Sequence, residues 1–348
     1  MGISTNFKYG LYMNLVLNKL SLLLAASLLA SCQQEKAEQA AIVDTAVEPA
    51  KFAEKYTRTE VDMALKQVSE HAWYAEGAAG AATDNEGFIS NAAVVITDEG
   101  VVIFDTLGTP SLAQKLLQLI REKTDQPIKY VILSHYHADH IYGLQVFEDE
   151  AAQIIAPTGA EIYLNSENAT SRLEERRVSL YPWVDESTRL VEPDEYIDTS
   201  KEILLGGLKL TLSYLGAAHS DGDISLYVEP DRVLFSGDVI FEGRVPFVGD
   251  ADTRHWLETL EKMELAELAA LVPGHGPAAT RPQEAIKSTR NYLAYLREQL
   301  AQAVEEFTPF DEAYAAIDWS AFAAMPAFDE AHRRNAYQVY LSLEAEGF

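Results

Sequence analysis

Cysteine and basic residues are scarce in this chain of 348 residues. Cys32 is its single cysteine, which excludes an intramolecular disulfide. Lysine and arginine number 27 against 54 aspartates and glutamates, and the formal net charge is −27 at pH 7. So acidic a chain repels the phosphate backbone of nucleic acids. We therefore expect no nucleic-acid partner, and a fold held together without disulfides.

Long apolar runs are also missing, apart from one short run near the beginning. Residues 20–31 are mostly leucine, alanine and serine, and the only charged residues up to that point are Lys8 and Lys19. A basic segment, a short apolar segment and small residues before a cut are typical of a secretory signal, and the run is too short for a comfortable membrane span. We expect residues 1–31 to be a signal peptide, and a start at Met13 would give it a more usual length.

The residues around Cys32 indicate that the signal is removed and the new terminus lipidated. Leu29-Ala-Ser-Cys32 resembles a bacterial lipobox, with the single cysteine where the lipid is attached. Gln33 comes next, whereas an aspartate would resemble an inner-membrane retention signal. We expect a lipoprotein of the bacterial cell envelope, held by lipid at Cys32 to the outer membrane and facing the periplasm. Residues 32–60 are polar and alanine-rich, as in a tether.

Beyond the tether, strand-like apolar runs alternate with helical patterns. Strands are predicted over residues 92–97, 101–104, 129–133, 153–156, 208–215, 224–228 and 233–235. Helices are predicted over residues 111–123, 256–268, 282–307, 311–317 and 331–346. This mixture fits an α/β sandwich, in which helices cover the outer faces of two stacked sheets. We expect this domain over residues 61–285. A helical extension over residues 286–348 would cover the active-site mouth, form a dimer surface or add a packed layer.

One segment concentrates metal-binding side chains. His135, His137, Asp139 and His140 lie within six residues, directly after the apolar run 130–133. A strand places the first two on one face, and the following turn can swing the other two toward a second position. Neutral imidazoles with a carboxylate are typical ligands of a transition metal. The segment therefore predicts a metal site at a strand end.

Other candidates occur in similar settings. His219, Asp238 and His275 each follow an apolar run and have glycine close by, and Asp105 follows the run 101–104. Such positions present a side chain from a loop at a strand end. The three remaining histidines, His71, His255 and His332, have no metal-ligand spacing with one another, and we expect them to be surface or core residues.

Together these stretches resemble the five motifs of the metallo-β-lactamase superfamily, over roughly residues 65–285. The resemblance implies an αββα sandwich with the site at one edge. It also implies the metal roles: a first metal bound by His135, His137 and His219, a second by Asp139, His140 and His275, and a bridge between both by Asp238. Asp105 resembles the aspartate that braces the site without binding metal. Such nitrogen and oxygen ligands suit two zinc ions, with iron or manganese as alternatives.

The resemblance implies a metal-dependent hydrolase. A metal-bound hydroxide would attack the carbonyl of a small-molecule ester, lactone, lactam or thioester. Asp139 is the candidate for passing a proton to the leaving group. Three other interpretations stay open: a class B β-lactamase proper, a mononuclear iron oxygenase of persulfides, and a non-catalytic binding lipoprotein. Asp238 stands where the cysteine-ligated lactamases have cysteine, which separates the chain from that subclass. The complete ligand set favours a two-metal enzyme over both the iron oxygenase and the binding lipoprotein.

The substrate side is less defined. Arg244 follows the bridging aspartate and is a candidate clamp for an anionic substrate, with a salt bridge to one of many acids as the alternative. Tyr136 and Tyr142 flank the ligands and are candidates for the pocket wall or the core. The basic patch of glyoxalase II is missing after Gly276, which disfavours a glutathione thioester. Residues 243–247 and 333–335 give the chain a resemblance to the quinoprotein relay system zinc metallohydrolases.

Overall fold

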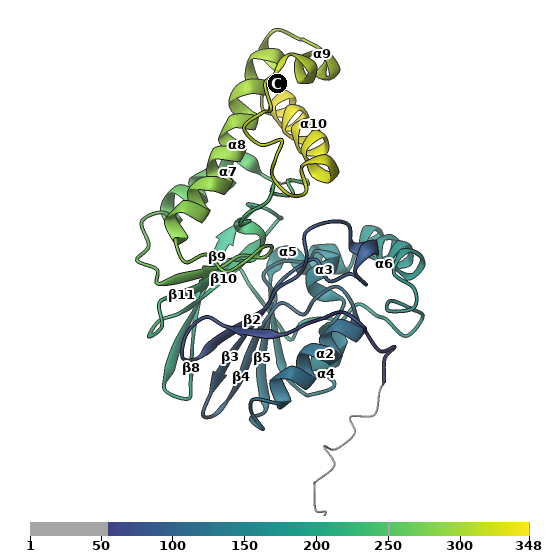
Figure 1. Cartoon of the computed structure of the whole chain (residues 1–348), viewed down its shortest axis with the longest axis vertical. Coiled ribbons are helices and arrows are strands. Elements are labelled where there is room, and N and C mark those ends of the chain that lie inside the picture. The colour runs from purple at the N-terminus through teal and green to yellow at the C-terminus, as the bar shows by residue number, and fades with distance from the viewer. Residues whose placement is uncertain (1–54, 250, 348) are drawn as a thin grey trace, which may run out of the picture. The chain divides into compact units, whose positions relative to one another are not determined.

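The computed structural model describes residues 55–249 and 251–347. Residues 1–31, Cys32 and most of the proposed tether lie outside this range, so the signal-peptide and lipidation predictions fall on residues that are not described. Contacts divide the chain into residues 1–55 and 56–348, and the second unit contains the fold. This unit is a mixed α/β structure with two sheets (Figure 1), which confirms the fold class expected from the sequence.

The first sheet has seven strands in sequential order. They are β1 (Leu65–Gln67), β2 (Ala72–Ala75), β3 (Ala92–Thr97), β4 (Gly100–Phe104), β5 (Ile128–Ile132), β6 (Gln153–Pro157) and β7 (Glu195–Ile197). The first four strands pair antiparallel, and β4 to β7 pair parallel. Parallel neighbours end at the same edge of a sheet, so the loops that come after β4, β5 and β6 meet there.

The second sheet has five strands in the order β12-β11-β10-β9-β8. They are β8 (Lys201–Leu205), β9 (Leu208–Gly216), β10 (Asp223–Val228), β11 (Val233–Phe235) and β12 (Ala270–Val272). Only β11 and β12 pair parallel. Three of the predicted strand-like runs lie in this sheet, whereas β8 and the three-residue β12 carry too weak a pattern to be predicted.

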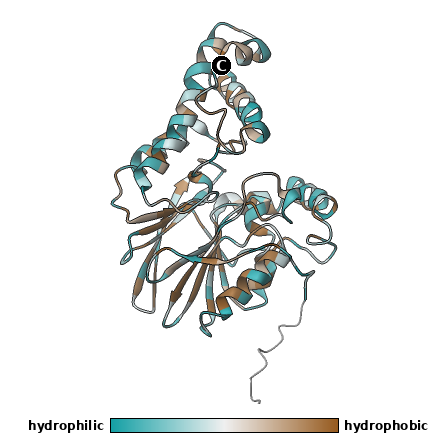
Figure 2. Ribbon diagram, viewed as in Figure 1, coloured by the Kyte–Doolittle hydropathy of each residue, from teal (hydrophilic) through white to brown (hydrophobic). Residues whose placement is uncertain are grey.

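Side chains from both sheets form one buried layer between them. Phe104 of β4 and Phe235 of β11 lie in this layer with their ring centroids 6.2 Å apart. The alternating burial of β9, in which Leu208, Leu210 and Leu212 point inward, explains why the sequence predicts this strand. Figure 2 shows the apolar character of the strands in both sheets.

Helices cover the outer face of the first sheet (Figure 1). They are α2 (Pro110–Arg121), α3 (Ala138–Ile141), α4 (Leu144–Glu148), α5 (Thr158–Leu164) and α6 (Glu167–Ser179). Helix α2 begins where its sequence indicates, because Thr109 accepts a hydrogen bond from the backbone N–H of Leu112 and Pro110 occupies the first turn. Helix α6 was not predicted, because only Ala169 and Leu173 are buried along its 13 residues.

A second group of helices follows on the side of the other sheet: α7 (Thr253–Met263), α8 (Pro282–Glu305), α9 (Phe310–Ala316) and α10 (Phe328–Gly347). Helix α7 and the beginning of α8 pack on this sheet, whereas α9 and α10 pack on α8 and extend away from the sheet (Figure 1). The predicted extension is therefore present, with α8 and α10 packed against each other as a helical hairpin. Within the described residues, no helix has both the length and the apolar character needed to cross a membrane.

Candidate metal centre

Seven His and Asp side chains converge at one edge of the sandwich. His135 and His137 follow β5, Asp139 and His140 lie in α3, and His275 follows β12. His219 lies between β9 and β10, and Asp238 lies in the short 3-10 helix η2 (Gly237–Val239) after β11. These are the seven residues that the sequence proposed as ligands, and the structure brings all of them together in two adjoining groups.

The first group consists of three histidines and one aspartate. The ligand atoms of His135, His137, His219 and Asp238 all lie within 4.8 Å of one another. Nδ1 of His137 is 2.9 Å from Nε2 of His135 and 3.0 Å from Nε2 of His219. Oδ2 of Asp238 is 3.4 Å from Nε2 of His219. Three imidazole nitrogens and a carboxylate oxygen therefore surround one position.

The second group contains Asp139, His140 and His275. Oδ2 of Asp139 is 3.2 Å from Nε2 of His275 and 3.5 Å from Nε2 of His140. Asp238 reaches this group as well, because its Oδ1 is 3.3 Å from Nε2 of His140 and its Oδ2 is 3.2 Å from Nε2 of His275. Asp238 is thus the one carboxylate that contacts both groups in the part of the chain that the structure describes.

Hydrogen bonds outside the cluster fix which nitrogen of His140 and of His275 faces it. His140 Nδ1 lies 2.9 Å from Asp105, and His275 Nδ1 lies 2.6 Å from the carbonyl oxygen of Ile89. Both partners are acceptors, so Nδ1 carries the proton and the lone pair of Nε2 points into the cluster. Outer hydrogen bonds of this kind orient histidine ligands in metal sites.

Buried polar atoms in the cluster support a metal ion at this place. Nε2 of His140 and Oδ1 of Asp238 face each other, yet neither has a hydrogen-bond partner among the described residues. When His140 is neutral, its Nε2 and the carboxylate oxygen are both acceptors, and two facing acceptors without partners repel and cost free energy. A cation between them would remove both costs. The donor set therefore fits two ions of the zinc type, each with nitrogen and carboxylate ligands.

The pKa values of the histidines in the cluster also favour the binding of cations there. Burial lowers the pKa of His135 well below its ordinary value and lowers the pKa of His219 to about 3, which leaves both rings neutral, as metal binding requires. Burial acts in the same direction on His140 and His275, but the nearby carboxylate of Asp238 outweighs it and raises the pKa of both rings. This part of the cluster therefore stabilises positive charge.

Asp105 braces the cluster from outside. Its carboxylate accepts hydrogen bonds from the backbone N–H and the hydroxyl of Ser134, both at 2.7 Å, and from Nδ1 of His140. The residue is buried and adopts a left-handed backbone conformation with φ 64°. Such a conformation costs a non-glycine residue free energy and is found most often at functional sites. Asp105 thus lies directly behind His140, and the bracing role implied by the family resemblance stays a prediction.

Two further residues hold the ligand loops in place. A Cβ atom on Gly274 would lie 1.9 Å from Oδ1 of Asp238, so only glycine allows the approach of the His275 loop to this carboxylate. Asp223 accepts hydrogen bonds from the backbone N–H groups of Ala218 and Ser220, on either side of His219. Burial raises the pKa of Asp223 to about 8.

Aromatic rings enclose the cluster on the side of the second sheet. The ring of Phe241 stacks on His275 with centroids 5.3 Å apart and an interplanar angle of 6°. Trp256 lies edge-on to His219, with centroids 5.3 Å apart, and its Nε1–H donates to the carbonyl of Val239. Both aromatic residues are buried. The sequence did not indicate that Phe241 and Trp256 enclose the cluster, because each is an ordinary apolar residue in its segment.

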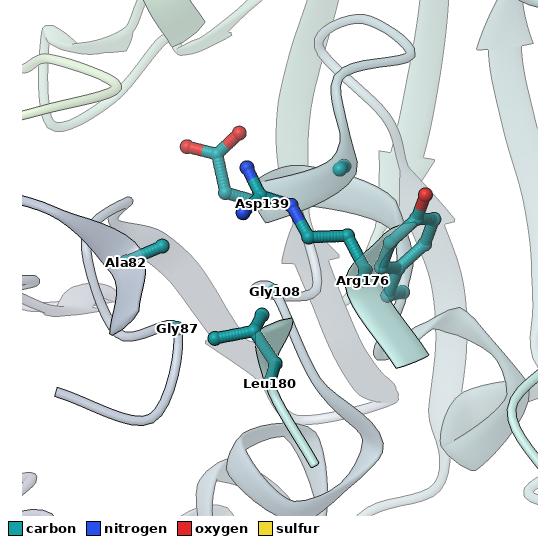
Figure 3. Close-up of a pocket in the computed structure, with 8 residues that line it drawn as sticks. Ala82, Gly87, Gly108, Asp139, Arg176 and Leu180 are labelled. Carbon is teal, nitrogen blue, oxygen red and sulfur yellow. The ribbon is translucent and has the colours of Figure 1, made fainter. Parts of the chain in front are cut away.

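A pocket opens beside Asp139. It is a small surface pocket, lined by residues of α3, α6 and the 3-10 helix η1 (Ala82–Asp84) with the loop after it. Figure 3 shows the side chain of Arg176, from α6, reaching toward Asp139, with Leu180 and Gly87 on the opposite wall. Tyr142 lines the same pocket, whereas the ring of Tyr136 stacks on Tyr163.

Arg176 is a pocket residue that sequence reasoning missed. Its guanidinium has one carboxylate within 4.0 Å among the described residues, that of Glu175 at 3.9 Å, and its side chain is 18% exposed. Helix α6 carries several arginines and glutamates in succession, so nothing in its sequence separates Arg176 from the solvent-exposed charges beside it. Only the position of α6 against α3 reveals that this cation faces the site.

Arg244 lies buried near the cluster and forms no salt bridge within the part of the chain that the structure describes. No carboxylate oxygen of the described residues comes within 4.0 Å of its guanidinium, and its Nε donates to the carbonyl of Val245 at 3.4 Å. Burial lowers the pKa of Arg244, whereas the more distant carboxylates of Asp238, Asp139 and Glu330 act to raise it. The salt bridge considered as the alternative for Arg244 is therefore not formed within the described residues.

The other three histidines lie outside the cluster. His71 pairs with Asp231 at 2.9 Å, and His255 contacts the carbonyl of Ala217. His332 is buried among the C-terminal helices, 3.0 Å from the hydroxyl of Tyr292. None of them joins the seven ligands, as expected from their sequence spacing.

Comparison with protein families agrees with this geometry. The family model of the metallo-beta-lactamase superfamily matches residues 85–275, a stretch that contains all seven candidate ligands. The chain belongs to this superfamily. A beta-lactamase-like protein 2 homolog from Caenorhabditis elegans is 25% identical over 233 residues, which cover 63% of this chain and 68% of that protein. A metallo-beta-lactamase type 2 from Bacteroides fragilis is 23% identical and covers 65% of this chain and 84% of that protein.

Alkylsulfatases are also among the similar proteins of this superfamily. A linear primary-alkylsulfatase from a Pseudomonas species is 24% identical over 249 residues, covering 62% of this chain and 47% of that enzyme. The structure of a stereoselective inverting sec-alkylsulfatase from Pseudomonas aligns with a TM-score of 0.61 at 18% identity, over 80% of this chain and 50% of that one. The chain thus spans about half the length of these sulfatases, and the structural likeness shows the shared fold.

Proposed function

We propose that this protein is a dinuclear zinc hydrolase that cleaves a small-molecule carbonyl substrate, namely an ester, lactone, lactam or thioester, that carries a negative charge. The observation that carries the proposal is the pair of ligand groups that share Asp238. Superfamily membership supports the hydrolase class, and the seven ligands of nitrogen and oxygen type support zinc at both positions.

Two zinc ions bound there would supply an activated water and polarise the bond under attack. The protein's own residues supply positioning and proton transfer. Asp139 reaches both the second ligand group and the pocket, so its carboxylate can accept a proton from the attacking water and pass it to the leaving group. Asp105 keeps His140 in the tautomer that presents Nε2 to the cluster.

The anionic character of the substrate is inferred from Arg244. A buried guanidinium without a carboxylate partner costs free energy unless another anion compensates its charge. A carboxylate, phosphate or sulfate group on the substrate would supply that anion and could accept two parallel hydrogen bonds. Arg176 adds a second cation on the pocket side of Asp139. Sulfate esters belong among the test substrates, because similar proteins are named as alkylsulfatases.

A turnover screen on the zinc-loaded protein tests this function. It uses nitrocefin, a lactone, an acyl thioester, an alkyl sulfate, and the two esters 4-nitrophenyl acetate and 4-nitrophenyl hydrogen succinate. We expect the succinate ester to be the better ester substrate and Arg244→Ala to remove this preference, with slow turnover of nitrocefin at best. Vigorous oxygen uptake with a persulfide would instead establish the iron oxygenase. The lactamase alternative is limited by Asp238, which stands where the cysteine-ligated lactamases have cysteine.

The cellular location belongs to the same proposal. The lipobox-like stretch ending at Cys32 supports a lipid-anchored protein at the outer membrane, with the domain facing the periplasm. A hydrolase held there would meet substrates that enter or leave the cell.

A further inference from the structure

The segment that carries Arg244 is fixed to the C-terminal helices at several points. It runs from Phe241 to Val248, immediately after η2 with the shared ligand Asp238. Segment 241–248 contains no regular helix or strand, so its backbone groups depend on partners from other elements. One partner is the carbonyl of His275, which accepts a hydrogen bond from the backbone N–H of Glu242 at 3.1 Å, and the others come from α8, from α10 and from the loop before α10.

The first clamp is made by Thr289 of α8. Its hydroxyl accepts a hydrogen bond from the backbone N–H of Phe241 at 3.2 Å and donates to the carbonyl of Phe241 at 3.1 Å. Thr289 is buried, so these bonds are not exchanged with water. Through Phe241, which stacks on His275, this helix also reaches the metal cluster.

The second clamp is made by Asn335 of α10, which is fully buried. Its Oδ1 accepts a hydrogen bond from the backbone N–H of Val248 at 2.9 Å, and its Nδ2 donates to the carbonyl of Pro246 at 2.6 Å. Nδ2 also donates to the hydroxyl of Tyr292 at 2.9 Å, which holds the amide in this orientation. The guanidinium of Arg334 lies 5.6 Å from the ring centroid of Phe247.

Arg244 lies between the two clamps. Phe241 precedes it by three residues and Pro246 follows it by two, and the N–H of Val245 donates to the carbonyl of Pro326 at 3.0 Å. No carboxylate of the described residues holds the guanidinium itself, so its position depends on the backbone that carries it. A cation must be held within a fraction of an ångström to bind an anion with two parallel hydrogen bonds.

We infer that Asn335 and Thr289 are positioning residues for substrate recognition, and that the helical hairpin α8–α10 sets the preference of this enzyme for anionic substrates by fixing segment 241–248. The inference rests on the proposed role of Arg244. It also connects the two stretches 243–247 and 333–335, which are far apart in sequence and carry the same family resemblance: they are in contact through Asn335 and Arg334.

The test compares Asn335→Ala and the nearly isosteric Thr289→Val with the control Arg333→Ala. Arg333 lies on the same helix but is exposed and pairs with Asp311 at 2.6 Å, away from segment 241–248. Asn335→Ala should raise KM for 4-nitrophenyl hydrogen succinate about tenfold while leaving 4-nitrophenyl acetate nearly unchanged. Thr289→Val also loosens Phe241, which stacks on His275, so its expected result is a rise of about tenfold in KM for the succinate ester relative to its own KM for the acetate ester. Calorimetry with succinate and neutral succinamide on the zinc-loaded proteins gives the same comparison without turnover.

Two further measurements separate positioning from general damage. Amide hydrogen exchange within segment 241–248 should become faster in both clamp variants and stay unchanged in the control. In the double variant Arg244→Ala/Asn335→Ala, the preference for the anion should fall no further than in Arg244→Ala alone. If Arg244→Ala loses the preference but a folded Asn335→Ala and Thr289→Val keep it, the inference is wrong and the proposed function stands. If Arg244→Ala keeps the preference, both the anion contact and this inference fail.

Discussion

The carboxylate of Asp105 lies 2.9 Å from Nδ1 of His140, and this contact turns Nε2 of the ring toward Asp238. Because Asp105 also holds Ser134 through two hydrogen bonds, a single carboxylate orders the start of the His-rich loop and one of its ligands.

Replacing this carboxylate should weaken metal binding without removing a ligand. The carboxylate of Asp105 can only accept a hydrogen bond from Nδ1–H of His140. The amide of Asp105→Asn can instead donate an N–H to Nδ1, which favours the tautomer with the proton on Nε2 and so blocks the ligand atom. We expect zinc affinity to fall roughly 10- to 100-fold, as for other residues behind a metal ligand. Competition with a zinc chelator measures this. Asp231→Asn, which alters the His71 contact instead, is the matched control, and equal affinities in all three proteins would contradict the bracing role.

Asp139 should have a catalytic task beyond holding metal. Asp139→Asn keeps the size of the side chain and one ligand oxygen but loses its basicity, and loss of proton transfer alone should lower kcat roughly 10²- to 10⁴-fold. Assays at saturating zinc with a good and a poor leaving group separate the two tasks. The poor leaving group should suffer more. An equal loss for both, or a normal rate once zinc is restored, would leave Asp139 as a ligand only.

The strands, helices and metal ligands could be predicted from the sequence only where the local residue pattern is strong. Strands β3 and β11 matched the predicted bounds, because each is a continuous apolar run ended by turn residues. The seven ligands could be named because metal binding requires particular residue types at strand ends. Helix α6 could not be predicted, since most of its residues face solvent and its helical pattern is therefore weak. Helix α5 has only seven residues, which is too short for an apolar period to stand out.

The surroundings of the site were less accessible to sequence reasoning than its ligands. Arg176, Thr289 and Asn335 act through contacts between elements far apart in the chain, and no short motif marks them. Arg244 was found because it comes closely after Asp238, but that no described carboxylate pairs with it is a property of packing alone. The domain boundaries, the lipid anchor and any dimer through the C-terminal helices stay predictions.

The buried His332 should make the fold more sensitive to acid. Burial lowers the pKa of this ring from 6.5 to about 4, so the unfolded chain takes up a proton more readily than the folded one. Stability should therefore fall as the pH drops from about 6.5 to about 4, by up to roughly 3 kcal/mol from this group. His332→Phe, which suits the surrounding rings of Phe328 and Trp319, should lose that part of the decline. Urea unfolding of both proteins with chelator at several pH values checks this, and parallel pH profiles would count against it.

Cys32 provides the test of location. Cys32→Ser should abolish acylation and either release the protein from membranes or stall its precursor, because the thiol is the only one in the chain. Fractionation of cells with metabolic labelling by a fatty-acid analogue tracks both effects. Wild-type protein found unacylated in the cytosol would rule out the anchor.

Counting metal ions per chain shows whether two ions share Asp238, as proposed. Protein dialysed from zinc-replete buffer, with protein quantified by amino-acid analysis and metal by mass spectrometry, should contain about two zinc ions per chain. His137→Ala, which removes a ligand of the first group, and His140→Ala, which removes one of the second, should each retain about one. A wild-type stoichiometry that stays near one ion, unchanged by the His140→Ala substitution, would contradict the account.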